Sequence, residues 1–372
     1  MKTRPVCITG IGVLSGAGVG REAFREALAR GEVTSLVEEW PGPFGGVRPI
    51  RVARIPAFDP RSLLPAGRLR RMTEGSRAGV VAAVLAERDA QERGAGGAVP
   101  PQRRAVVLGT GLGPLETTGE IMALLAREGP PGAEPFLFIE SLHNSPAGHS
   151  CIVLDCRGPT LTPVSGDASG LAAVIEGVNL IREWRADRAY AGGWEEIPPF
   201  LVGLLAQLLP TGRSIPLLGA GAAVFRLEAD PVRGAPYAWI VSSARGHDPT
   251  ARDLDYGTDP SVPRQVLEGV LKGAGWRWED VDLLLTAENG FATLGSLEEQ
   301  VYSDWPVLTA PAESRRRRPA LTFGAFAGSG SLIVAAAALA LDEGRENCRR
   351  ALVCLPSWGG GCQAVALSST PD

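Results

Sequence analysis

The chain has 372 residues, of which 45% are apolar and 21% charged, and this composition excludes a disordered protein. The net charge of −4 argues against a general nucleic-acid binder, because such proteins are usually basic. The six cysteines have no CxxC spacing and there are only three histidines. This composition predicts no metal site and indicates the buried thiols of a cytoplasmic protein.

Strands and helices are predicted to alternate along the chain. Short β-rich runs flanked by glycine predict buried strands, and apolar residues at helical spacing predict helices. The alternation indicates an α/β architecture with largely buried sheets. The predicted strands cover 6–12, 105–108, 188–191, 237–241, 282–286 and 351–354, and the predicted helices cover 21–30, 76–93, 115–127, 171–184, 263–272 and 332–341.

The two halves of the sequence resemble one another. A Ser-Gly step leads into an apolar helix and then a strand at 169–193, and the same order returns at 329–355. The period is too long for a solenoid. We therefore expect one internally duplicated fold, with an N-terminal half at 1–228 and a C-terminal half at 229–372.

A series of short motifs follows one another along nearly the whole chain. They are ITGIGVLS at 8–15, LGTGLG at 108–113, NSPAGH at 144–149, SGDASG at 165–170, AGG at 191–193 and WGGG at 358–361. Together they resemble the β-ketoacyl synthase family of the thiolase superfold. The resemblance implies a thiolase-like αβαβα layered fold built from two pseudo-repeats. Only the stretch between 200 and 218 is shorter than in the family.

The same resemblance implies that the catalytic groups of the family are missing. A condensing synthase needs a cysteine at a strand-to-helix elbow to form a thioester, and two histidines to promote decarboxylation and stabilise the enolate. Here the elbow carries Asp167. The first histidine position aligns with Glu288, or with Asn289 after a shift of one residue, and the second aligns with Gly324. We therefore expect no condensing activity from this chain alone, and we expect Asp167 to cap the helix at 171–184.

A non-catalytic paralogue of this kind is known in type II polyketide synthases as the chain-length factor, or ketosynthase β subunit. The resemblance implies a heterodimer with an active ketosynthase α subunit, an acyl chain tethered to an acyl carrier protein, and no cofactor. Leu115, Thr118 and Met122 share one helix face and match positions that gate the acyl tunnel in such subunits, with Phe200 or its neighbour Leu201 as a further candidate.

The residue at the elbow also indicates the class of polyketide that the complex makes. Chain-length factors for aromatic polyketides usually carry glutamine there. The aspartate at 167, together with the compact chain, favours the polyene-type, highly reducing branch.

Two other functions stay open. The chain could be a stand-alone thiolase-fold enzyme with altered chemistry, a decarboxylase or hydrolase that uses Asp167 and Glu288 as a carboxylate pair. It could also be a degenerate homodimer that only binds acyl carrier protein. The basic run at 315–318 is either a solvated turn or a docking patch for such an acidic carrier.

Overall fold

The computed structural model describes residues 4–209, 215–229, 234–252, 255–303, 315–344 and 348–371. No helix within these ranges is both long and apolar enough to cross a membrane. The first part of the chain holds β1 (Val6–Ser15), β2 (Gly18–Val19), α1 (Arg21–Arg30), β3 (Leu36–Pro41), β4 (Val47–Ala53), α2 (Ala66–Leu69), α3 (Glu74–Glu92), β5 (Arg104–Gly109), α4 (Leu115–Glu128), α5 (Pro135–Glu140), α6 (Ser145–Val153), β6 (Thr160–Leu161), α7 (Ser169–Arg182), β7 (Arg188–Glu195), α8 (Pro199–Leu208), β8 (Leu218–Gly219) and β9 (Gly221–Ala229).

The rest of the chain continues the alternation. It holds β10 (Ala238–His247), α9 (Ser261–Ala274), β11 (Leu283–Thr286), α10 (Ala292–Ser303), β12 (Arg316–Arg317), α12 (Pro319–Phe323), α13 (Ser331–Glu343), β13 (Arg350–Pro356) and β14 (Gly361–Ser368). The junction expected at 228–229 falls at the end of β9, and the division into two halves stays a prediction.

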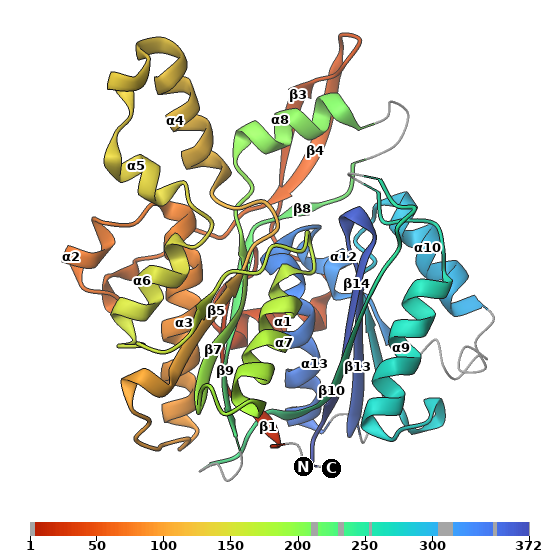
Figure 1. Cartoon of the computed structure of the whole chain (residues 1–372). Coiled ribbons are helices and arrows are strands. Elements are labelled where there is room, and N and C mark those ends of the chain that lie inside the picture. The colour runs from red at the N-terminus through yellow and green to blue at the C-terminus, as the bar shows by residue number, and fades with distance from the viewer. Residues whose placement is uncertain are drawn as a thin grey trace.

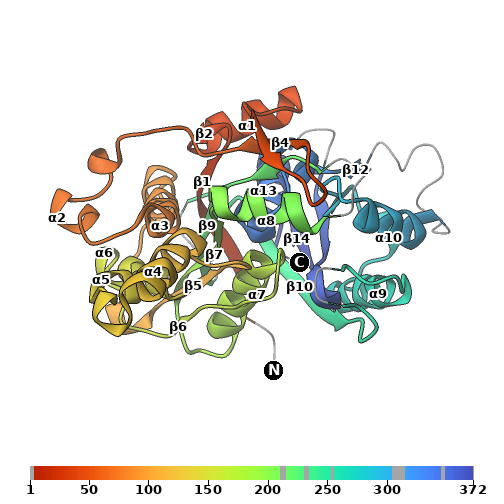
Figure 2. The same cartoon turned by 90° about the horizontal axis from the view of Figure 1, so that it is seen from above.

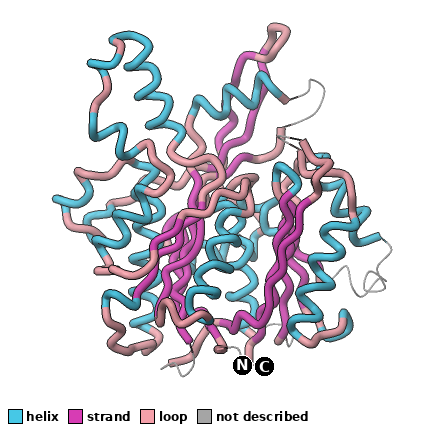
Figure 3. Tube along the Cα trace, in the orientation of Figure 1, coloured by secondary structure: helices cyan, strands magenta, loops and turns pink. Residues whose placement is uncertain are grey.

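Most of the described strands form one sheet with two wings. Its order is β12-β11-β13-β14-β10-β1-β9-β7-β5-β6, with β2 beside β1. Helices α7 and α13 lie between the wings, α3 and α6 cover one outer face, and α9 and α10 cover the other (Figure 1). The tube in Figure 3 shows the same five layers. The predicted αβαβα layering is therefore confirmed.

Close packing between α3 and β1 depends on two glycines. A Cβ atom on Gly10 or Gly12 would collide with the backbone carbonyl of Ala86 or Ala82 in α3. The glycines in the ITGIGVLS motif therefore let this helix lie directly against the central strand. That contact holds α3 against the N-terminal part of the sheet, which also carries the elbow before α7.

A small sheet stands apart from the layers. Its order is β3-β4-β8, and α8 lies along the hairpin formed by β3 and β4 (Figures 1 and 2). The sequence did not predict this hairpin, because its strands are largely exposed and carry charged residues. Helices α4 and α5 project on the same side of the molecule as α8 (Figure 1).

Candidate functional site

The elbow before α7 does not use Asp167 as a helix cap. The helix begins at Ser169, its cap position is Ala168, and no side chain caps its first turn. The Ser169 hydroxyl instead accepts a hydrogen bond from the Ser165 N–H and donates to the Gly166 carbonyl, which closes the turn locally. The predicted capping role of Asp167 is therefore wrong, because the turn directs its side chain away from the helix.

The Asp167 carboxylate is instead held by residues from two distant loops. One oxygen accepts a hydrogen bond from the Tyr256 hydroxyl at 2.7 Å, and the other accepts the Trp358 backbone N–H at 3.3 Å. The Asn289 side-chain amide donates to the Tyr256 hydroxyl at 2.9 Å. Burial raises the pKa of Asp167, and burial beside this carboxyl raises the pKa of Tyr256 well above its usual value. Asp167, Tyr256 and Asn289 are thus joined in one buried network of hydrogen bonds.

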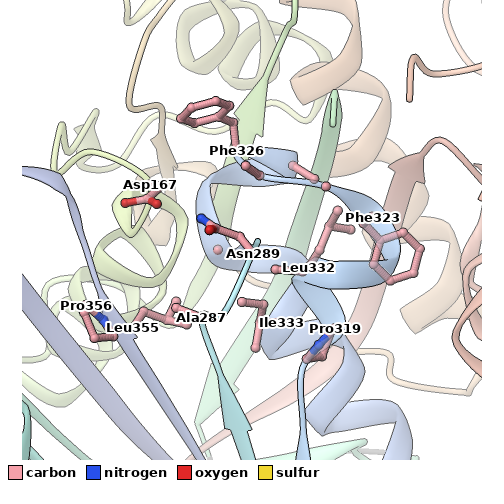
Figure 4. A pocket seen from close by; sticks show the side chains of 15 residues that line it. Asp167, Ala287, Asn289, Pro319, Phe323, Phe326, Leu332, Ile333, Leu355 and Pro356 are labelled. Carbon is pink, nitrogen blue, oxygen red and sulfur yellow. The ribbon is translucent and has the colours of Figure 1, made fainter. Parts of the chain in front are cut away.

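The side chains of Glu288 and Asn289 point in different directions. Asn289 lines a small cavity together with Asp167 and Gly324 (Figure 4). Glu288 lies outside that lining, and its carboxylate pairs with Arg318 at 2.6 Å and Arg316 at 3.4 Å. The structure therefore brings Asp167 together with Asn289, the alternative alignment, and it shows no contact between Asp167 and Glu288.

Gly324 could not carry a side chain without rearrangement. Its φ is 94° and its ψ is 161°, a conformation that side chains rarely adopt. A Cβ atom built there would lie 2.6 Å from the Gly219 nitrogen and 2.8 Å from the Leu218 carbonyl carbon. The position aligned with the second histidine is thus closed to any side chain by the neighbouring strand β8.

Aromatic side chains fill the space above this cavity. The ring centroids of Phe326 and Trp358 are 4.9 Å apart, those of Phe291 and Trp358 are 5.8 Å apart, and Tyr256 closes the cluster at 6.1 Å from Trp358. The cavity beneath has a volume of about 30 Å³, which holds a water molecule or two and no acyl chain. Phe326 adopts a left-handed φ of 72°. Such strain in a bulky residue persists only where the surrounding packing fixes it.

The sequence carries no signal for Tyr256, the key partner of Asp167. Tyr256 lies in a loop and belongs to no motif, so nothing in the sequence connects it with the elbow. The sequence did point to the WGGG motif, whose Trp358 N–H reaches Asp167. Within the described ranges, no group of three or more His, Cys, Asp or Glu side chains could hold a metal ion.

The predicted gating residues lie on a projecting and partly uncovered helix. Leu115 and Thr118 are half-buried on α4, and Met122 is 61% exposed. The Thr118 hydroxyl donates a hydrogen bond to the Pro114 carbonyl of its own helix at 2.8 Å. On α8, Phe200 is 57% exposed whereas Leu201 is 4% exposed, so Phe200 rather than Leu201 faces away from the core.

Exposed apolar residues extend from this region to the edge of the large sheet. Helix α5 and the turn after it expose four large apolar side chains, and β6, the last strand of the sheet, exposes one with another just beyond it. Figure 2 places α4, α5, α6 and β6 on one side of the molecule. The residues are Phe136, Phe138, Ile139, Leu142, Leu161 and Val164. An apolar surface of this kind beside a sheet edge is typical of a protein interface.

The basic run at 315–318 is not a solvated turn. Arg316 and Arg317 form β12, which pairs in parallel with β11. Arg316 is buried and pairs with the buried Glu298 at 2.8 Å, while its guanidinium lies 4.7 Å from the centre of the Tyr302 ring. Only Arg315 and Arg317 are exposed, so at most alternate residues of the run face solvent. A docking role for this run stays untested.

The family model of the β-ketoacyl synthase N-terminal domain matches residues 3–209. The ketoacyl synthase beta subunit of the tetracenomycin polyketide synthase from Streptomyces glaucescens is 27% identical over 366 residues, which cover 91% of this chain and 86% of the relative. The 3-oxoacyl-[acyl-carrier-protein] synthase 2 of Vibrio cholerae is 26% identical over 308 residues, covering 76% and 72%.

Solved structures show the same fold. The ishigamide ketosynthase/chain length factor matches with a TM-score of 0.80 at 19% identity, over 99% of this chain and 100% of that chain. The ketosynthase ApeO in complex with its chain length factor ApeC, from Xenorhabdus doucetiae, matches with a TM-score of 0.78 at 14% identity, over 98% of both chains.

Proposed function

This chain belongs to the β-ketoacyl synthase family, and on that premise we propose that it is a non-catalytic chain-length factor. It would pair with an active ketosynthase and shape the tunnel into which an acyl chain on acyl carrier protein grows. The observation that carries the proposal is the geometry around Asp167 at the elbow before α7. Where the family places its thioester-forming cysteine, Asp167 is hydrogen-bonded to Tyr256 and Trp358 and lines a cavity that holds a water molecule or two.

The geometry disfavours a stand-alone enzyme. Acid–base work by two carboxylates requires that they lie close enough to separate their pKa values. Glu288 instead forms salt bridges with Arg316 and Arg318 and makes no contact with Asp167. A substrate would also have to displace Phe326 and Trp358, which pack edge to face. The site is therefore better explained as a closed structural remnant than as an altered active centre.

The exposed apolar surface supports a partner subunit. Phe136, Phe138 and Ile139 are all more than two-fifths exposed on α5, and β6 leaves one side of the sheet without a strand neighbour in the described ranges. Covering these groups would remove a large apolar area from water at about 25 cal/mol per Å². The comparison proteins include ketosynthases solved with their chain length factors. We infer that a ketosynthase α subunit covers this face.

The chemistry of the gating face supports a reduced chain of the polyene type. Leu115, Met122 and Phe200 are apolar, and the Thr118 hydroxyl already donates to the Pro114 carbonyl. A chain that carries a ketone at every second carbon would leave its carbonyl oxygens without donors along this wall. Each unpaired carbonyl costs about 1–3 kcal/mol. A chain of methylenes or conjugated double bonds has no such penalty.

The test combines assembly and product analysis. The chain is co-expressed with a ketosynthase α subunit and a carrier protein, and native mass spectrometry determines the stoichiometry. We expect a one-to-one heterodimer that condenses malonyl units when neither chain does so alone. A homodimer that turns over acyl substrates by itself, or a chain that binds carrier protein without any synthase, would reject the proposal.

Gating is tested within the same heterodimer. We expect Met122→Trp to shorten the product, because the larger side chain fills the tunnel on the exposed face of α4. Glu120→Trp is the matched control, since Glu120 lies on the opposite face of the same helix. Equal product lengths for the two variants and the parent, with synthase activity retained, would contradict the gating role.

A further inference from the structure

The hairpin of β3 and β4 holds α8 at both ends. The Arg54 guanidinium donates to the Ile197 carbonyl just before the helix begins. At the other end, one Arg48 nitrogen donates to the Ala206 carbonyl at 2.9 Å and to the Leu209 carbonyl at 2.7 Å. The Ala206 carbonyl is one of the four that the C-terminal end of the helix leaves without an intrahelical donor, and Leu209 directly follows the helix. The hairpin therefore supplies the C-terminal cap of α8.

The middle of α8 rests directly on the indole ring of Trp40. A Cβ atom on Gly203 would lie 2.9 Å from two ring carbons of Trp40, closer than real Cβ atoms come. The ring cannot swing aside freely, because its N–H donates to Glu38 at 3.1 Å and Glu38 is paired with Arg54 at 2.7 Å. Gly203 is thus the contact point that determines how closely the helix approaches the hairpin.

The exposed side of α8 that carries the candidate gate adjoins the side that rests on Trp40, since Phe200 precedes Gly203 by three residues. Leu201, Val202 and Leu205 are buried in the core cluster that includes β4. Phe200, Leu204 and Leu208, spaced four residues apart, are all exposed. Because an α-helix moves as a rigid element, any change in its distance from the hairpin is transferred to this exposed row.

We propose that the β3–β4 hairpin positions α8, through Trp40 at Gly203 and Arg48 at the helix end, and thereby sets how far Phe200 and its row project into the acyl tunnel. Trp40, Arg48 and Gly203 are positioning residues for product length, and they touch no substrate themselves. The inference rests on the proposed chain-length function and adds to it an element that the motifs of the family do not mark. Its physical basis is a tight contact on one side of a helix whose adjoining side is exposed.

The test is Gly203→Ala in the assembled heterodimer. The added methyl group moves α8 away from Trp40, and Phe200 and its row move with the helix. We expect the ratio of the longest product to the next shorter one to change about tenfold, which corresponds to about 1.4 kcal/mol. Gly295→Ala in α10 is the matched control, since a Cβ there meets nothing within 4 Å. We expect the control to keep the parental ratio.

A compensating substitution separates positioning from loss of stability. Trp40→Phe removes ring volume beneath Gly203, so we expect the double variant Gly203→Ala with Trp40→Phe to recover the parental ratio. A variant that was merely unstable would lose all products in proportion, and the ratio would not move. An unchanged ratio in Gly203→Ala, or no recovery in the double variant, overturns the proposal.

Failure of this inference can be told apart from failure of the chain-length function. If Met122→Trp shortens the product and Gly203→Ala leaves the product ratio unchanged, α4 gates the tunnel and the hairpin has no part in it. If neither changes the product of an active heterodimer, the chain-length function itself is wrong.

Discussion

The closure of the site at Gly324 leads to a quantitative prediction. The resemblance to the family predicts that this position replaces a catalytic histidine, and it is occupied by a glycine with a φ of 94° and a ψ of 161°. We consider the smallest possible side chain there, in the variant Gly324→Ala. If even a methyl group is strongly unfavourable, then a histidine cannot be restored at this point by simple substitution.

The expected cost has two parts. Holding a residue with a side chain in this backbone region costs about 1–3 kcal/mol. The new Cβ would also lie 2.6 Å from the Gly219 nitrogen and 2.8 Å from the Leu218 carbonyl carbon, both backbone atoms of β8. Relieving such an overlap costs about 1–3 kcal/mol more. We therefore expect the free energy of unfolding to fall by about 2–6 kcal/mol.

Urea unfolding followed by tryptophan fluorescence and far-UV circular dichroism measures this change. Gly344→Ala is the control for backbone conformation alone, because Gly344 has a φ of 58° and a Cβ there would meet nothing within 4 Å. We expect the control to lose about 1–2 kcal/mol. Equal losses in the two variants, or a loss below about 1 kcal/mol in Gly324→Ala, would refute the steric reasoning.

Two further substitutions test the buried charges. Glu298→Ala leaves the buried Arg316 guanidinium without its 2.8 Å partner, and we expect a loss of about 3–5 kcal/mol in urea unfolding. Glu176→Ala, which breaks a partly exposed pair with Arg245, should cost less than about 1 kcal/mol, and similar costs would show that burial does not matter. Burial raises the pKa of Glu196 from 4.5 to about 7, so the protonated form favours the fold and stability should fall as the pH rises from about 4.5 to 7. We expect Glu196→Gln to remove this slope between pH 5 and pH 8, and an unchanged slope would exclude Glu196 as its source.

The layered fold could be predicted because its elements have strong local signals. Helix α1 begins and ends where the periodicity predicts, at Arg21 and Arg30, and Gly31 terminates it in a left-handed conformation with a φ of 76°. The hairpin of β3 and β4 has no such signal. Its residues are largely exposed and its position depends on contacts with α8, more than 140 residues later in the chain. Short-range periodicity carries no information about a partner so distant.

From the sequence, the site could be predicted only as a set of missing catalytic residues. The sequence identified Asp167 and Gly324 as replacements, but it could not show that Tyr256 would bind the carboxylate, because a loop tyrosine has no fixed spacing from an elbow. For the same reason it could not decide between Glu288 and Asn289. The choice depends on Arg316 and Arg318, which draw Glu288 away from the cavity.

The pairing of β1 has a consequence for how the chain is made. Val6 pairs with Ala229 on one side and with Ile240 on the other, so the first strand to leave the ribosome must wait for both neighbours. At 5–20 residues per second, that wait is roughly 10–45 s. Pairings so distant in sequence fold slowly and leave apolar strand edges open in the meantime. The nascent chain should therefore depend on chaperones, and heterologous production should yield more native subunit at low temperature and slow translation.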